Sequence, residues 1–376
     1  MVYATLKNKR LQQKIAYSSL AALVVLLAVA AFVLGRIVPP HPPHEVPGTA
    51  PSPVEQMTDE PEAPLPELMC GLDAVVSPED ALAAEDSPFA GPMTFSVRVG
   101  DHVNRFRLMS YFVMPGEAVE LQIIPDARSR HMEVWTVDGS SSQRDSVTWV
   151  WEPPSDPGIY CLNLIDREND EVMSLNAVVL VPFEGGEAMN GYRIGRYKEV
   201  PLRFDPAYET PRGLVELTPR NREAWLSPHF QLKQFECKQA AGYPRYLVVQ
   251  TRLVLQLETL LERVRETGID ATTFFVMSAY RTPHYNAVIG NDTRYSRHVY
   301  GDAADVFIDR DRNGIMDDLD RDGRSDIDDA LVLSRLFDAI QERPTAEFLG
   351  GLGAYGSTPS HGPFVHVDAR GRKARW

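Results

Sequence analysis

The chain has 376 residues, 44% of them hydrophobic, which is enough for two modest globular domains and additional segments. Its net charge is −14, and this acidity argues against a nucleic-acid partner, because phosphate binding requires basic patches. The three cysteines, Cys70, Cys161 and Cys237, include no CxxC pair, which argues against a cysteine-based zinc knuckle.

The first element in chain order is an apolar run at residues 18–38, SSLAALVVLLAVAAFVLGRIV. From Ser18 to Gly35 it carries no charge, and as a helix it approaches the thickness of a bilayer core. The basic residues that precede it, with no acidic residue among them, are Lys7, Lys9, Arg10 and Lys14. We therefore predict a cytoplasmic tail at 1–17, a single transmembrane helix in the inner membrane, and a periplasmic location for the rest. The alternative is a cleaved signal peptide, which the length of the run and the lack of a clean A-x-A site disfavour.

A proline-rich segment at 39–68 is predicted to be an extended linker, because so many prolines prevent regular helix or sheet pairing. From about 92 to 184 the pattern changes to short strands: Val119, Leu121 and Ile123 alternate with polar residues. Further half-buried strands are marked by Val134, Val147, Trp149 and Trp151. The stretch DPGIYCLNL at 156–164 resembles a late strand of immunoglobulin-like sandwiches. We predict a small β-sandwich that serves as a spacer or a protein-binding module.

Two cysteines belong to this region of the chain. We expect Cys161 to face the core of the sandwich, and Cys70 can form a disulfide with it in an oxidising compartment. The alternative is that both are free buried thiols, because cysteine packs well as a small hydrophobic residue.

A connector at 190–226 leads to a C-terminal domain at 227–376. A helix ending near Gly268 is indicated by apolar residues at three- and four-residue steps, namely Val249, Leu253, Leu257, Leu260 and Val264. A second helix is predicted from about Asp328, with Leu333, Leu336, Phe337 and Ile340 on one face and Pro344 beyond its end. Short apolar strands are expected at 274–277, 352–355 and 364–368. Helices and short strands that alternate in this way indicate the α+β class.

The chemistry of this domain is concentrated in SRHVYGDAAD at 296–305. His298 and Asp305 flank Gly301, which permits a tight turn, and a zinc site needs imidazole and carboxylate ligands brought together in this way. The remaining protein ligand is expected from a distant strand, and His366 in HGPFVHVD at 361–368 supplies it.

This motif resembles the SxHxxGxAxD signature of the zinc D-Ala-D-Ala carboxypeptidase family, which also contains the VanX dipeptidases, phage L-Ala-D-Glu endolysins and the murein endopeptidase MepK. Upstream, SAYRTPHYN at 278–286 is similar to the S-x-Y-R segment of that family. Downstream, GGLGAYG, GPFVHVD and ARW at 350–376 look like the MepK-type branch. The resemblance covers about 227–376. It implies a hedgehog/D-Ala-D-Ala-peptidase-like fold for this domain.

The resemblance also implies roles for individual residues. It makes His298, Asp305 and His366 the zinc ligands. Arg281 would hold the substrate carbonyl or stabilise the oxyanion, for which a guanidinium group is well suited. Ser296 would hydrogen-bond the substrate or orient the loop that carries His298.

The general base is not identified by the motif. Many members of the family have Glu or Asp three residues before the last histidine ligand, where this chain has Pro363. Candidates to replace it are His361, Asp368 and Asp302, provided that one of them reaches the attacking water. His361 is favoured weakly, and Asp368 can instead fix the orientation of a ligand histidine.

An acidic insert at 309–329 separates the two halves of the predicted zinc site. One repeat follows the spacing of calcium-binding loops with Asp309, Asp311, Asn313 and Asp317 around Gly314. The next repeat contains Asp318, Asp320, Asp322, Asp326 and Asp329. We predict two structural calcium loops of dockerin or thrombospondin type; the alternative is a solvated acidic loop.

Together these patterns predict a membrane-anchored zinc peptidase, with peptidoglycan as its partner and substrate. The reaction is either endopeptidase cleavage of cross-links or carboxypeptidase cleavage of stem peptides. The alternative is a non-catalytic, membrane-tethered protein that binds or scaffolds the cell wall, which the absent acid at position 363 would suit.

Overall fold

The computed structural model describes residues 89–127, 131–291, 293, 295–342 and 349–376. The predicted cytoplasmic tail, the span at 18–38, the linker at 39–68 and Cys70 lie outside these residues. No helix among the described residues is long and apolar enough to cross a membrane.

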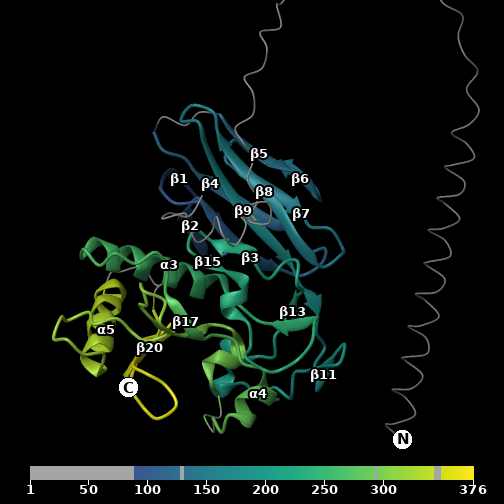
Figure 1. Ribbon diagram of the computed structural model, residues 1–376. Helices are drawn as coiled ribbons and strands as arrows, with labels where there is room; N and C mark the ends of the chain where they lie inside the picture. Colours follow the sequence, from purple (N-terminus) through teal and green to yellow (C-terminus); the bar gives the residue numbers. More distant parts are fainter. Residues whose placement is uncertain (1–88, 128–130, 292, 294, 343–348) are drawn as a thin grey trace, which may run out of the picture. The chain divides into compact units, whose positions relative to one another are not determined.

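The first part of the described chain consists of two β-sheets, drawn in blue in Figure 1. The antiparallel sheet has the order β2-β1-β4-β7-β6 and contains β1 (Pro92–Val99), β2 (His102–Phe106), β4 (Val119–Ile124), β6 (Ser140–Gln143) and β7 (Thr148–Glu152). The other sheet has the order β3-β9-β8-β5 and contains β3 (Leu108–Val113), β5 (Met132–Thr136), β8 (Gly158–Asp166) and β9 (Glu171–Val179). In that sheet β3 runs parallel to β9, whereas the other pairs are antiparallel.

Side chains of both sheets meet in one core, as the alternating pattern predicted. Leu121 and Ile123 of β4 are buried there together with Trp149 of β7, and Leu162 and Leu164 come from the other sheet.

Cys161 was expected to face this core, and that expectation is wrong. Successive side chains of a strand point to opposite faces, so Cys161 lies on the face opposite Leu162 and Leu164. It is half-buried and disulfide-bonded, whereas Cys237 is a buried free thiol.

Small strand pairs and short 3-10 helices connect the sandwich to the C-terminal domain. The strands are β10 (Val181–Pro182), β11 (Ala188–Met189), β12 (Tyr192–Arg193), β13 (Gly213–Leu217), β14 (Trp225–Ser227), β15 (Phe230–Gln231) and β16 (Arg245–Leu247). The 3-10 helices are η1 (Leu202–Phe204), η2 (Pro206–Tyr208) and η3 (Leu232–Phe235). β13 pairs with both β10 and β16, so one small sheet joins segments that are far apart in the sequence.

The C-terminal domain is built on a sheet with the order β17-β18-β20-β19-β21. Its strands are β17 (Phe275–Ser278), β18 (Ala303–Phe307), β19 (Gly351–Tyr355), β20 (Phe364–Asp368) and β21 (Ala374–Arg375). The helices are α3 (Thr251–Glu266), α4 (Pro283–Val288) and α5 (Ile327–Gln341), with the 3-10 helix η4 (Arg297–Tyr300) before β18. α5 packs against α3 and against β19 and β20 (Figure 1). The two long helices and the three short strands of this domain are thus confirmed, and strands predominate over helices in the described chain.

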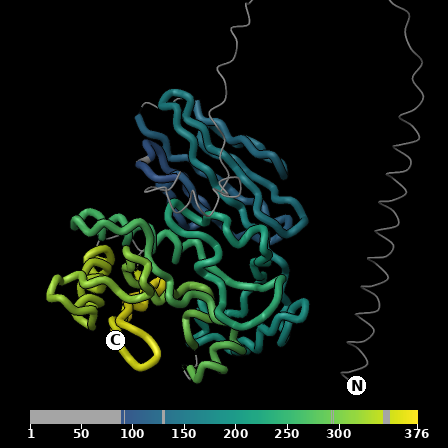
Figure 2. The backbone as a smooth tube through the Cα atoms, in the orientation of Figure 1, coloured from purple at the N-terminus to yellow at the C-terminus, as the bar shows by residue number. Residues whose placement is uncertain are grey.

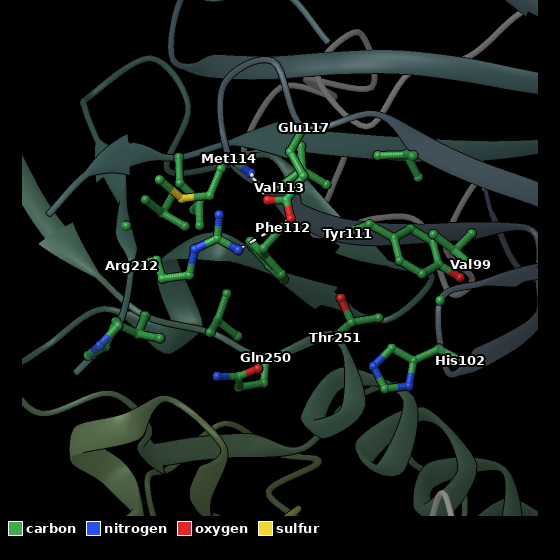
Figure 3. A pocket seen from close by; sticks show the side chains of 18 of the residues that line it. Val99, His102, Tyr111, Phe112, Val113, Met114, Glu117, Arg212, Gln250 and Thr251 are labelled. Atoms are coloured by element: carbon green, nitrogen blue, oxygen red, sulfur yellow. Dashed lines mark hydrogen bonds and ion pairs between the residues drawn. The ribbon is translucent and has the colours of Figure 1, made fainter. Parts of the chain in front are cut away.

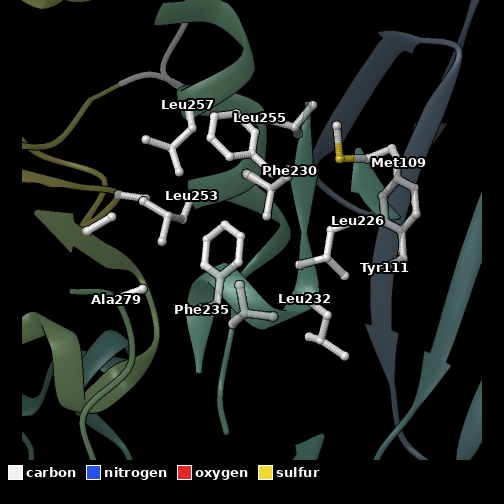
Figure 4. Packing of buried hydrophobic residues seen from close by; sticks show 14 of the residues in the cluster. Met109, Tyr111, Leu226, Phe230, Leu232, Phe235, Leu253, Leu255, Leu257 and Ala279 are labelled. Carbon is white, nitrogen blue, oxygen red and sulfur yellow. The ribbon is translucent and has the colours of Figure 1, made fainter. Parts of the chain in front are cut away.

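All described residues belong to one compact unit, and one hydrophobic core extends from the sandwich into the C-terminal domain. Met109 and Tyr111 of β3 face Leu226 and Phe230, as Figure 4 shows. Polar contacts reinforce this junction: the Thr251 hydroxyl donates to the Ser110 carbonyl at 2.9 Å, and the Asn176 amide donates to the Trp225 carbonyl at 2.7 Å. Arg105 and Glu262 form an exposed ion pair across it. Figure 2 follows the backbone through this junction.

A cavity of about 540 Å³ lies at the same junction. Residues of β3 and the following turn line one side, and residues 248–251, just before and at the start of α3, line another. Glu117 and Arg212, which both line it, form an ion pair at 3.2 Å (Figure 3). Val248, which lines this cavity, is also in close contact with Gly301 of the predicted zinc-binding loop.

Candidate metal centre

Three predicted ligands come together from two neighbouring strands and one turn. β18 and β20 are antiparallel, and their register places Asp305 directly opposite His366. His298 lies in η4, immediately before β18. All three side chains are nearly inaccessible to solvent, with 3% exposure for His298, 4% for Asp305 and 8% for His366.

Gly301 makes this arrangement possible. Its φ of 72° lies in the left-handed region, which glycine adopts without a steric cost. A Cβ atom at this position would lie 2.5 Å from the carbonyl oxygen of Val248, so no side chain fits. The Gly301 carbonyl accepts a hydrogen bond from the Gln250 amide at 2.9 Å. The turn that carries His298 is thereby fixed against the segment that leads into α3.

The donor atoms lie close enough together to hold a zinc ion. Asp305 Oδ1 lies 2.8 Å from His366 Nδ1 and 3.2 Å from His298 Nε2, and the two nitrogens are 3.2 Å apart. Tetrahedral zinc with ligand bonds of about 2.0–2.1 Å needs donor atoms roughly 3.3 Å apart. Because one position of a tetrahedron then stays open, these residues fit a catalytic metal site of the His-Asp-His type.

Neighbouring groups fix which nitrogen of each imidazole faces the site. His298 Nδ1 lies 2.7 Å from the Ala279 carbonyl oxygen, an acceptor, so Nδ1 carries the proton and Nε2 faces the ligands. His366 is turned the other way, with Nδ1 toward Asp305 and Nε2 3.4 Å from Asp368. Asp368 is held by the Arg370 guanidinium and by the Gly351 amide, at 2.7 and 2.9 Å. Of the two roles predicted for Asp368, this geometry favours the orientation of a ligand histidine.

The charges of the site depend on how its buried groups interact with one another. Burial lowers the pKa of His298, which keeps this imidazole neutral. Burial also acts against a charged His366, but hydrogen bonds to Asp305 and Asp368 prevail and raise its pKa to about 9. Burial acts to raise the pKa of Asp305, yet the two histidines hold it well below its ordinary value. The Asp305 carboxylate therefore stays charged, paired with Arg281 and His366, and a zinc ion would have to displace the proton of His366 in order to bind there.

Arg281 contacts a predicted metal ligand directly. Its guanidinium donates to Asp305 Oδ2 at 2.5 Å and to the Ser278 hydroxyl at 2.8 Å, and its amide donates to the His298 carbonyl at 3.2 Å. The side chain also lines the cleft above the ligands. Arg281 thus orients Asp305 in addition to facing the cleft. Ser296 lines the same cleft, and its carbonyl accepts from the Val299 amide at 3.1 Å.

The candidate bases differ in their surroundings. Asp302 is fully buried in an ion pair with Arg297, whose guanidinium stacks on Tyr208 at 4.3 Å, so both of its oxygens are occupied. His361 is half-buried, with Nδ1 2.8 Å from the Gly362 carbonyl and its ring against Phe364, a residue of the cleft wall. Among the described residues, His361 Nε2 has no hydrogen-bond partner. His361 is therefore the one candidate of the three without a charged partner, and it contacts the cleft only through Phe364, because its own side chain does not line the cleft.

The cleft over the ligands has a volume of about 670 Å³. Its walls include residues that sequence reasoning did not assign to the site, namely Tyr208, Tyr295, Tyr355, Arg370, Arg372 and Trp376. For Trp376, the only signal in the sequence was the ARW segment of the MepK-type resemblance. That resemblance implied no role for Trp376. The positions of Tyr355 and Trp376 depend on the pairing of β21 with β19, which no local pattern predicts.

The acidic insert forms two groups of carboxylates between β18 and α5. One group contains Asp309, Asp311 and Asp317, and the other contains Asp318, Asp320 and Asp322; the ligand atoms of each group lie within 4.8 Å of one another. The same turn recurs in both, because Gly314 donates to Asp309 at 2.9 Å and Gly323 donates to Asp318 at 2.8 Å. Of the other predicted ligands, Asn313 donates to Asp311 at 2.8 Å, whereas Asp326 and Asp329 form the capping box of α5. The two calcium loops stay a prediction.

Calcium is expected to raise the melting temperature of the protein. Close carboxylates repel one another, and an ion that binds only the folded loop stabilises it by mass action, by about 2.7 kcal/mol at a concentration of 100 Kd. A chelator selective for calcium over zinc should lower the melting temperature in calorimetry, and added calcium should restore it. The double substitution Asp311→Ala and Asp320→Ala should remove this response with zinc still bound, whereas the exposed Asp101→Ala should keep it. A wild-type melting temperature that ignores calcium would leave the solvated acidic loop as the correct interpretation.

Comparison with known proteins gives one match. Residues 228–325 match the family model described as Peptidase M15, and this range includes Arg281, Ser296, His298 and Asp305 but ends before His366. No curated protein matches the chain. No solved structure matches it either. The matched residues supply β17, β18 and two of the three predicted ligands, so the C-terminal domain of this chain belongs to the peptidase M15 family.

Proposed function

We propose that the protein is a zinc-dependent metallopeptidase that hydrolyses peptide bonds in the stem peptides or cross-links of peptidoglycan. One observation supports this most strongly: His298, Asp305 and His366 present three donor atoms 2.8–3.2 Å apart at the base of a cleft, within a peptidase M15 domain. A zinc ion held by them supplies the Lewis acidity that polarises a substrate carbonyl and activates water. The fold of the domain is, in this proposal, hedgehog/D-Ala-D-Ala-peptidase-like.

Residues of the chain itself orient the metal ligands and supply charge to the site. Asp368 and the Ala279 carbonyl orient the two imidazoles, and Arg281 orients Asp305. Arg281 also offers positive charge to the oxygen of the substrate carbonyl as negative charge develops there. His361 is the proposed group that takes the proton of the attacking water, because it is the candidate base without a charged partner and its ring packs on Phe364 of the cleft wall.

The location proposed for this activity is the periplasmic face of the inner membrane. It is supported by the apolar run at 18–38 and the basic residues before it. The disulfide at Cys161 agrees with an oxidising compartment. A reporter domain fused after Trp376 tests this placement, because activity of a cytoplasm-specific reporter would contradict it.

Digestion of purified peptidoglycan sacculi tests the activity. The full chain, purified in detergent with one zinc per molecule, should release soluble muropeptides that mass spectrometry identifies. Loss of cross-linked dimers would identify an endopeptidase, and release of single terminal residues would identify a carboxypeptidase. His298→Ala serves as the control and should release nothing. If the zinc-loaded wild type binds sacculi and releases nothing from them, the scaffolding alternative is correct.

A further inference from the structure

One short segment contacts both the sandwich and the turn that carries His298. This segment, residues 247–251, leads from the end of β16 into α3. On one side, the Thr251 hydroxyl donates to the Ser110 carbonyl at 2.9 Å, and both residues are buried. Ser110 belongs to β3, which is an edge strand of its sheet. The neighbouring residue, Gln250, bonds the turn of the predicted zinc ligand, so two adjacent residues join the sandwich to that turn.

Gln250 holds this turn at two points. Its amide donates to the Gly301 carbonyl at 2.9 Å, and its side-chain Nε2 donates to the Tyr300 carbonyl at 3.3 Å. The Gly301 amide in turn donates to the His298 carbonyl at 3.4 Å and closes the 3-10 turn. Because only this one turn separates the contacts of Gln250 from His298, a displacement of Gln250 is transmitted to the ligand.

The same segment lacks packing on another side. Residues 247–251 line the junction cavity of about 540 Å³, and Tyr111, Phe112 and Val113 of β3 line it as well (Figure 3). Side chains on opposite sides of a void make no van der Waals contacts across it. The hydrogen bonds of Thr251 and Gln250 therefore matter more for the position of this segment than they would in a closely packed core.

We propose that Thr251 and Gln250 are positioning residues through which the sandwich holds His298 in place for zinc. This inference rests on the zinc site of the proposed function. His298 Nε2 lies 3.2 Å from each of the other two donor atoms, and a metal site requires ligand distances within about 0.2 Å of their ideal values. A small displacement of the turn therefore weakens zinc binding. The sandwich, which lies outside the residues that the family model matches, thereby sets the zinc affinity of the C-terminal domain.

The test measures the zinc dissociation constant of the full chain, well below its melting temperature, by competition with a chelator of known affinity. Thr251→Val keeps the shape of the side chain but removes the hydroxyl. It should weaken zinc binding about tenfold, the lower end of the range for groups that orient a metal ligand. Thr251→Ser keeps the hydroxyl and should bind zinc as the wild type does. Gln250→Ala removes only the bond to the Tyr300 carbonyl and should weaken zinc binding about threefold.

Two controls separate positioning from stability. Thr259→Val makes the same substitution within α3, where the Thr259 hydroxyl donates to the Leu255 carbonyl at 2.9 Å. Leu226→Val weakens the junction elsewhere, because Leu226 is buried where Met109 and Tyr111 face it (Figure 4). Leu226→Val should lower the melting temperature. Both controls should keep the zinc affinity of the wild type.

Wild-type zinc affinity in a folded Thr251→Val variant would overturn this inference. A loss of affinity in Leu226→Val as large as that in Thr251→Val would also overturn it, because zinc binding would then follow stability alone. If Thr251→Val does not fold, Gln250→Ala decides, since its exposed side chain can be removed without opening the core; unchanged affinity in that variant would then overturn the inference. If the wild type binds no zinc, the proposed function itself fails, and this inference fails with it.

Discussion

His298→Ala and His366→Ala are each expected to remove bound zinc and to abolish hydrolysis of muropeptides. Each substitution removes one of three donor atoms that lie 2.8–3.2 Å apart, and two remaining ligands cannot complete the tetrahedral set. The metal content should fall from about one zinc per chain to near zero in elemental analysis. Without zinc, the site loses both the polarisation of the carbonyl and the activation of water.

A matched control separates loss of the site from loss of the fold. His131→Ala makes the same substitution in the sandwich, where His131 pairs with Glu168 at 2.6 Å far from the ligands in sequence. It should keep both zinc and activity. Circular dichroism should show that the two ligand variants remain folded, because only their site is altered. Full activity of either ligand variant in the absence of zinc would show that the ligand assignment is wrong.

Arg281→Lys is expected to lower kcat by about 10²–10³-fold with zinc at saturation, the range typical of losing one oxyanion-stabilising donor. Arg281 binds Ser278 with one guanidinium nitrogen and Asp305 with another, and it still faces the cleft. A lysine ammonium is a single point of charge on a flexible stem and cannot hold these positions together. The loss should therefore appear in kcat more than in KM.

The zinc occupancy must be controlled in this experiment, because Arg281 also orients Asp305, a predicted zinc ligand. Loss of a group that orients a metal ligand typically weakens metal binding about 10–100-fold, so each measurement needs excess zinc and a determined metal content. Arg105→Lys is the control, since Arg105 forms an ion pair with Glu262 that is exposed and lies outside the cleft. A kcat of Arg281→Lys equal to that of the wild type would restrict Arg281 to a structural role.

Most of the site could be predicted from the sequence, because the central residues of the site lie in short segments in which local structure sets the spacing of the residues. The spacing of His298, Gly301 and Asp305 reflects one 3-10 turn and the strand that follows it. The apolar residues before His366 mark the strand that brings it opposite Asp305. The two long helices were predictable for the same reason, since apolar residues recur in them at three- and four-residue steps.

The other features of the site could not be predicted from the sequence, because they depend on tertiary contacts. The ion pair of Arg370 with Asp368 and the position of Trp376 arise where β21 pairs with β19, and neither residue belongs to a periodic pattern. The ion pair of Arg281 with Asp305 likewise joins two segments through the pairing of β17 with β18. The orientation of Cys161 was mispredicted because a strand with several buried residues on both faces does not show which face meets the core.

The core shared by the sandwich and the C-terminal domain has a consequence for cooperativity. Met109 and Tyr111 are buried partly by side chains of the other domain, and Thr251, at the first turn of α3, is bonded to β3. Neither half can therefore melt without exposing apolar surface of the other, and calorimetry should record a single transition for both. A fragment that begins at 227 would expose this surface to water. The sandwich is in this sense part of the folding unit of the peptidase and not an appended module.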